Sequence, residues 1–151
     1  MFEEVTNPYA KPIVDCIKEY GDRIQFCDSV PNLPELVVLG QTTLTSEKLN
    51  GLGFILREAG LNTKPVCFLA CNELDLLAVL EGLDPQGIIC IDTFACKALI
   101  HTYNAKVNKA EFKKGICTVF GRPTLLFSNL EKCYEANRVK CLKKLIQIDS
   151  F

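Results

Sequence analysis

The sequence predicts an α/β fold: a three-layer α/β/α sandwich with a central, mainly parallel sheet of four strands. Short apolar runs without alternation are typical of strands buried on both faces, and they lie at 36–40, 65–70, 87–91 and 123–127. Each run is followed by residues that can cap a helix and then by helical apolar spacing. A buried strand leading into a capped helix is the βα unit of a parallel sheet, and its crossovers should be right-handed.

Length and composition predict one domain over residues 1–151. The chain has 151 residues, of which 48% are hydrophobic, so it can bury a sizeable core. Before the first strand we expect a helix at 8–20, with Pro12 in its first turn, and a loop at 21–35.

The first βα unit begins with the strand 36–40, which ends in Gly40. Thr45 or Ser46 caps a helix that runs to about Gly60. The residues expected on its inward face are Leu49, Leu52, Gly53 and Leu56. Gly51 and Gly53 are expected to allow close packing on the sheet, at a cost of about 1 kcal/mol each against Ala.

The second unit places a strand at 65–70 and a helix at 73–82, capped by Asn72. Its inward residues are expected to be Leu74, Leu77 and Ala78. A turn at 84–87, with a proline at its second position and a closing glycine, leads into the third strand.

The third unit is the centre of the fold. The strand 87–91 runs directly into Asp92 and Thr93, both good N-cap residues. Further along, 116–120 and 123–127 flank Gly121-Arg122 as a hairpin whose second arm enters the sheet. A closing helix is expected at 130–146.

Nine cysteines are spread along the chain without a CxxC pair. Several fall in predicted strands or on apolar helix faces, where a reduced cysteine behaves as a small hydrophobe. Cys67 and Cys71 bracket a strand end and have no second pair at zinc-ribbon spacing. We therefore expect buried thiols, and neither a metal nor a cofactor.

The net charge of −1 hides an asymmetry. Residues 1–100 carry 7 Lys/Arg and 14 Asp/Glu, whereas residues 101–151 carry 10 and 4. A basic C-terminal third suggests DNA or an acidic partner, although a solvated helix face and loop would give the same pattern. The basic candidates for such a face are Lys106, Lys109, Lys113, Lys114, Arg122, Arg138, Lys140 and Lys144.

Two features bear on location. No apolar run approaches the roughly 18–20 residues of a membrane span, so no membrane partner is expected. The first residues are acidic where a signal peptide has lysines. The expected location is the cytoplasm.

Polar residues follow each predicted strand, at the edge where parallel sheets bind ligands. With Gly40 at the end of the first strand, the residues of this edge are Gln41, Thr42, Asn72, Asp92, Thr93, Ser128 and Asn129. Amides and hydroxyls with one carboxylate suit hydrogen bonding better than proton transfer. The same residue types also serve as helix caps and turn residues, so both interpretations stand.

The order of elements over about 36–146 resembles the uracil-DNA glycosylase superfamily, especially its shorter bacterial branches. The residues that carry the resemblance are Gly40, Arg57–Leu61, the Leu83-Asp-Pro85 turn, Ile88–Ala95, Lys114-Gly115, Gly121–Pro123 and Lys140. The resemblance implies a uracil-DNA glycosylase-like sandwich and an association with DNA repair or replication.

The chain departs from the family's motifs. Gln41 stands where the family orients its attacking water, and Asn72 is a shifted counterpart of the base-reading Asn. The stretch 42–49 lacks the aromatic that stacks on the flipped base. Ser128-Asn129 replaces the His-Pro pair, and the only histidine, His101, belongs to another helix. The stacking ring and the charge-supporting imidazole are both absent, so we expect the scaffold to be used for binding.

The tail 147–151 resembles the short clamp-binding peptide of bacterial DNA replication and repair proteins. Gln147, Ile148 and Phe151 match that pattern, and Ser150 departs from it where leucine is usual. The resemblance implies a sliding clamp or another replication or repair protein as partner; an ordinary chain end is the alternative.

Three hypotheses follow. The first is a non-catalytic interaction protein on a glycosylase-like scaffold, for which the psi subunit of the replicase clamp loader offers an analogy of fold. The second is a divergent uracil or damaged-base glycosylase that uses Gln41, Asn72 and Asp92. The third is an unrelated α/β domain that binds a small molecule at the same edge.

Overall fold

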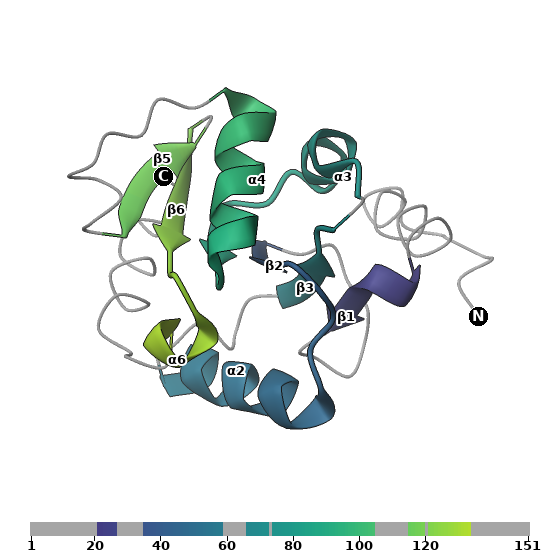
Figure 1. Cartoon of the computed structure of the whole chain (residues 1–151), viewed down its shortest axis with the longest axis vertical. Coiled ribbons are helices and arrows are strands. Elements are labelled where there is room, and N and C mark those ends of the chain that lie inside the picture. The colour runs from purple at the N-terminus through teal and green to yellow at the C-terminus, as the bar shows by residue number, and fades with distance from the viewer. Residues whose placement is uncertain are drawn as a thin grey trace.

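The computed structural model describes residues 21–26, 35–58, 66–72, 74–104, 115–119 and 121–133. They form an α/β fold around one six-stranded mixed sheet (Figure 1). Its strands are β1 (Ile24–Phe26), β2 (Leu36–Gly40), β3 (Val66–Ala70), β4 (Gly87–Cys90), β5 (Ile116–Val119) and β6 (Arg122–Leu126). The helices are the 3-10 turn η2 (Gly21–Arg23), α2 (Ser46–Glu58), α3 (Leu76–Leu83), α4 (Thr93–Tyr103) and α6 (Leu130–Cys133).

The strand order is β1-β3-β2-β4-β6-β5. The four predicted strands β3, β2, β4 and β6 are parallel neighbours, with Val38 of β2 opposite both Phe68 and Ile89. The expected four-stranded sheet is nevertheless wrong, because two antiparallel strands extend it at its edges. β5 is the first arm of the predicted hairpin, whereas β1 lies inside the predicted loop 21–35 and has only three residues. A strand this short has no alternation to detect.

Helices cover both faces of the sheet. In Figure 1, α2 and α6 lie below it, and α3 and α4 lie above it. Alternate residues of one strand point to opposite faces, so Val38 packs with Leu52 and Leu56 of α2, while Val37 packs on the α3 and α4 side. All five residues of β2, β3 and β6, and all four of β4, are buried. The α/β/α layering follows from strands that are apolar on both faces.

Two helix predictions need correction. Asp75, and not Asn72, caps α3, and its side chain accepts a hydrogen bond from the N–H of Ala78. The later start turns Leu77 and Ala78 outward and buries Leu76, Val79, Leu80 and Leu83 instead. On α2, a Cβ built on Gly53 would meet nothing within 4 Å, so this glycine does not bring the helix close to the sheet.

Some predicted elements lie outside the described residues. These are the helix at 8–20, the part of the last helix beyond 133, and the tail 147–151. Over the ranges that are described, none of the helices has the length and apolarity to cross a membrane.

Candidate functional site

The carboxyl ends of the four parallel strands meet through backbone hydrogen bonds. The N–H of Cys71 donates to Gly40 at 2.8 Å, that of Ile91 to Leu39 at 2.9 Å, and that of Phe127 to Cys90 at 2.9 Å. Pairing therefore continues just past the strands, and the prediction that the strand ends converge on one edge is confirmed.

The order of the strands identifies one point on this edge. The chain leaves β2 for β3 on one side and later returns to β4 on the other side. Such a switch point is where open α/β sheets bind ligands. Gln41 follows β2 and Asp92 follows β4, so both residues lie at the switch point.

The side chain of Asp92 joins the two strands there. Its Oδ2 accepts a hydrogen bond from the backbone N–H of Gln41 at 2.8 Å. Its Oδ1 accepts one from the N–H of Ala95 at 2.7 Å and so caps α4, as predicted. Each oxygen of the carboxylate thus has a backbone donor. Asp92 therefore links the end of β2 to the start of α4.

The other edge residues surround Asp92 with polar groups. The N–H of Asn72 donates to the carbonyl of Gln41 at 3.1 Å, so Gln41 is hydrogen-bonded to both Asn72 and Asp92, the other two catalytic candidates. The exposed members of the set are Gln41, Thr42, Asn72, Thr93, Ser128 and Asn129. Phe94 adds an aromatic ring that is 39% exposed. These groups offer hydrogen bonds and one stacking surface to a ligand.

Beneath the edge, the space next to Gly40 is filled. A Cβ on Gly40 would lie 2.6 Å from Cζ of Phe68 and 3.2 Å from Cδ1 of Ile91. Phe68 is fully buried in the core on the α2 side. Gly40 therefore has a packing role, because only a residue without a side chain leaves room for this ring.

The described cysteines, Cys67, Cys71, Cys90, Cys96 and Cys117, are all buried thiols, as predicted. The Sγ of Cys96 donates to the carbonyl of Phe127 at 3.5 Å. Burial, with a smaller effect of the Asp92 charge, raises the pKa of Cys71 to about 11. A hydrogen bond with Cys96, together with burial, raises the pKa of Cys90. The raised pKa values mark Cys71 and Cys90 as structural cysteines rather than nucleophiles, whereas the hydrogen bond with Cys90 lowers the pKa of Cys96.

The prediction that Arg122 belongs to an exposed basic face for DNA or a partner is wrong. It is 8% exposed and donates to Pro85, Glu81 and Asp84 at 2.9, 3.2 and 2.7 Å. It lies at the start of β6, in the strand and not in the predicted turn. The other basic candidates, Lys106, Lys109, Lys113, Lys114, Arg138, Lys140 and Lys144, lie outside the described residues, as do Gln147, Ile148 and Phe151.

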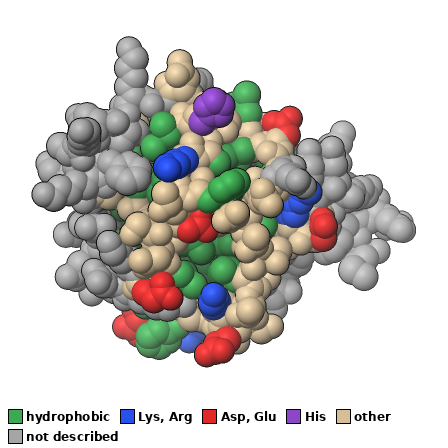
Figure 2. All heavy atoms as spheres, viewed as in Figure 1, with side chains coloured by type: hydrophobic (Ala, Val, Ile, Leu, Met, Phe, Trp, Pro, Cys, Tyr) green, Lys and Arg blue, Asp and Glu red, His purple; other side chains and the backbone are tan. Residues whose placement is uncertain are grey.

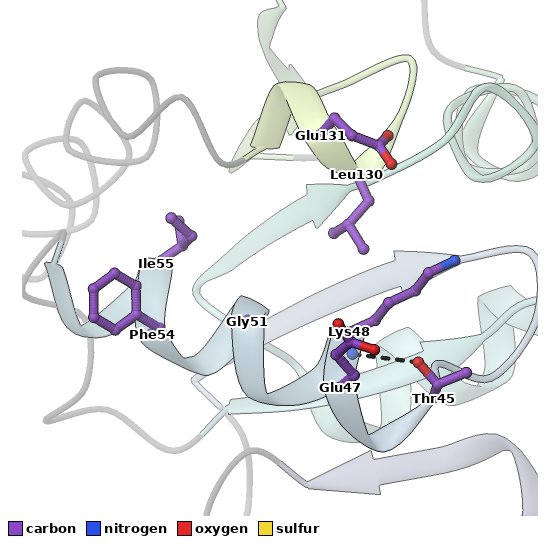
Figure 3. Close-up of a pocket in the computed structure, with 8 residues that line it drawn as sticks. All are labelled: Thr45, Glu47, Lys48, Gly51, Phe54, Ile55, Leu130 and Glu131. Carbon is purple, nitrogen blue, oxygen red and sulfur yellow. Dashed lines mark hydrogen bonds between the residues drawn. The ribbon is translucent and has the colours of Figure 1, made fainter.

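A cavity of about 650 Å³ lies between α2 and α6 (Figure 3). The residues that line it are Thr45, Glu47, Lys48, Gly51, Phe54, Ile55, Leu130 and Glu131. The sequence did not predict this cavity, because its walls come from two helices far apart in the chain and its charged residues resemble an ordinary solvated face.

In the described ranges, no group of three or more His, Cys, Asp or Glu side chains could hold a metal ion. In comparisons with known proteins, the chain matches no family model and no curated protein.

Proposed function

We propose that this protein is a non-catalytic interaction protein on a DNA-glycosylase-like α/β scaffold, associated with DNA replication or repair. The observation that carries the proposal is the use of the Asp92 carboxylate. Both oxygens accept backbone N–H groups, one from Gln41 and one from Ala95. The acidic group at the switch point therefore has a structural task.

The rest of the edge supports binding. Release of a nucleobase requires stabilisation of the charge that develops on the departing base. Near Asp92, the described edge offers neutral groups, the amides of Gln41 and Asn72 and the hydroxyls of Thr93 and Ser128. Such groups can read a partner by hydrogen bonds, and the exposed ring of Phe94 can stack on a base or an apolar side chain.

The association with DNA rests on the resemblance of the element order to the uracil-DNA glycosylases. The parallel strands, taken in chain order, are arranged second-first-third-fourth, with the switch point next to the first. The basic C-terminal third and the tail at 147–151 agree with a polyanion or a clamp as partner.

Base release is the first test. Purified protein is incubated with uracil- and hypoxanthine-containing DNA, single- and double-stranded, and free base is measured. We expect no release from either strand form. Release that is lost in Gln41→Ala would overturn the proposal in favour of a divergent glycosylase.

Partner binding is the second test. We expect retention on DNA that weakens with salt and is lost when Lys113 and Lys114 are both changed to Glu. Affinity for a bacterial sliding clamp is compared with and without residues 147–151, and deletion should abolish it. Retention that depends on neither salt nor charge reversal would refute the proposed DNA-binding face. Clamp affinity that the deletion leaves unchanged would refute the proposed role of the tail.

A further inference from the structure

The cavity between α2 and α6 has the form of a groove. Phe54 and Ile55 lie toward one end of it and Thr45, Glu47 and Lys48 toward the other, while Leu130 points from α6 toward α2 (Figure 3). From Thr45 to Ile55 the helix rises about 15 Å, at 1.5 Å per residue. An extended peptide covers that length with about four or five residues.

The groove has an apolar floor. Ile55 and Leu130 are each 9% exposed and belong to the same core cluster. Gly51 lines the groove on α2 without a side chain, so the wall there is helix backbone. Phe54 continues the apolar surface outward and is 56% exposed. An aliphatic or aromatic side chain of a ligand would find apolar contacts with these residues.

The rim of the groove is charged. Glu47, Lys48 and Glu131 are exposed, and no ion pair joins them in the part of the chain that the structure describes. The backbone N–H of Lys48 donates to Oγ1 of Thr45 at 3.3 Å, which fixes the start of α2 at this end of the groove. Two carboxylates against one ammonium favour a ligand with net positive charge. The exposed face of Phe54 also attracts a cation.

Figure 2 shows hydrophobic side chains near the middle of the face seen in Figure 1, with charged side chains among and around them. In the groove itself, apolar side chains lie next to the charged residues of the rim, and apolar surface inside a polar rim is the usual anatomy of an interface between proteins.

We propose that the α2–α6 groove binds a short cationic, apolar peptide segment of a partner protein. An apolar side chain of the segment packs between Ile55 and Leu130, and a flanking Lys or Arg pairs with Glu131 or Glu47. This inference rests on the proposed function, since it names the site and the chemistry of the partner of an interaction protein.

The test uses the full chain and a positional-scanning library of acetylated octapeptide amides. We expect selected peptides to carry Lys or Arg beside Leu, Met or Phe. The best peptide is then labelled, and its affinity is measured by fluorescence anisotropy. Changing both Glu47 and Glu131 to Lys should weaken binding by roughly tenfold or more and shift the selected charge to acidic.

Glu58→Lys is the matched control, because Glu58 is an exposed carboxylate on the same helix that does not line the groove. It should change the affinity by less than about twofold. Phe54→Ser tests the apolar wall at an exposed position, where loss of the ring should weaken binding about fivefold or more while the circular dichroism spectrum is unchanged.

Three results would each overturn the groove proposal. The first is an absence of any peptide with a Kd below about 1 mM, and the second is equal effects of the rim double variant and Glu58→Lys. The third is dimerisation of the chain that the rim double variant abolishes, because the groove would then be occupied by a second copy. A negative base-release assay together with DNA or clamp binding would then leave the proposed function standing.

Discussion

The carboxylate of Asp92 holds together the two strands on either side of the switch point. One oxygen accepts from the N–H of Gln41, just past β2, and the other from the N–H of Ala95 in the first turn of α4. A residue that caps a helix therefore also fixes the distance between the ends of β2 and β4. The two hydrogen bonds use different oxygens of the carboxylate, so different substitutions of Asp92 can distinguish their contributions to stability.

Asp92→Ala removes both hydrogen bonds and should lower the free energy of unfolding by about 2 kcal/mol, the sum of a cap and one further hydrogen bond. Asp92→Asn keeps an oxygen for the cap but turns an NH₂ group toward the N–H of Gln41, and should cost about 1 kcal/mol. Urea denaturation gives both values. Asp75, which caps α3 through Ala78 alone, is the control. Asp75→Asn should be nearly neutral, and an equal loss in the two Asn variants would contradict a second role for Asp92.

Gly40→Ala should lower the free energy of unfolding by about 1–3 kcal/mol, because the added methyl group would meet Phe68 at 2.6 Å in a fully packed core. Combining it with Phe68→Leu should cost less than the sum of the two single changes. Gly82→Ala on α3 has nothing within 4 Å of the new Cβ and should stabilise by about 0.5 kcal/mol. Additive losses of stability in the double variant would show that the ring of Phe68 is not the reason why position 40 requires glycine.

The sequence is most informative where local chemistry decides the structure. Asp92 is followed at once by helical spacing, and both the cap and the start of α4 are as predicted. At α3, Asn72 and Asp75 are both good caps, and the burial of Leu76 and Leu80 decides between them. That choice depends on the sheet, which a local pattern does not contain.

Features made by distant segments could not be predicted. The pairing of β1 with β3 depends on three residues that read as loop. Arg122 looks like a surface cation, but three acceptors from the α3–β4 region surround it in the fold. The groove likewise requires Ile55 and Leu130, 75 positions apart, to face each other.

Arg122 connects β6 to the end of α3 and the turn before β4. Arg122→Ala should lower the free energy of unfolding by about 2–3 kcal/mol, because it removes hydrogen bonds to two carboxylates and leaves the buried carbonyl of Pro85 without its donor. Arg122→Lys keeps the charge but loses the planar fork, and should give an intermediate loss. Arg57→Ala, at an exposed site, should change stability by no more than about 0.5 kcal/mol. A loss for Arg122→Ala as small as that of the control would refute the structural role.

Glu81 makes this connection sensitive to acid. Hydrogen bonds from Tyr103 and Arg122 hold the pKa of Glu81 below its usual value. Its contribution to stability is therefore fully present above the unfolded-state pKa of about 4.3, and it is lost as the pH falls through the folded-state pKa. The stability difference between wild type and Glu81→Gln, measured in urea from pH 7 to pH 3, should shrink on the acid side. A constant difference would contradict the coupling, and Glu58→Gln controls for a general loss of negative charge.

Cys71 should resist alkylation, because its pKa of about 11 leaves little thiolate at pH 8. Compared with glutathione, iodoacetamide should label it about a hundredfold more slowly, as followed by peptide mass spectrometry. Because the folded state retains the proton that the unfolded chain loses near pH 8.5, stability should fall as the pH rises toward 11. Asp92 contributes to this raised pKa through its charge, so Asp92→Asn should shift the labelling midpoint to lower pH. Asp75→Ala controls for destabilisation alone, and an equal shift in that variant would show that unfolding, not the Asp92 charge, governs the reactivity of Cys71.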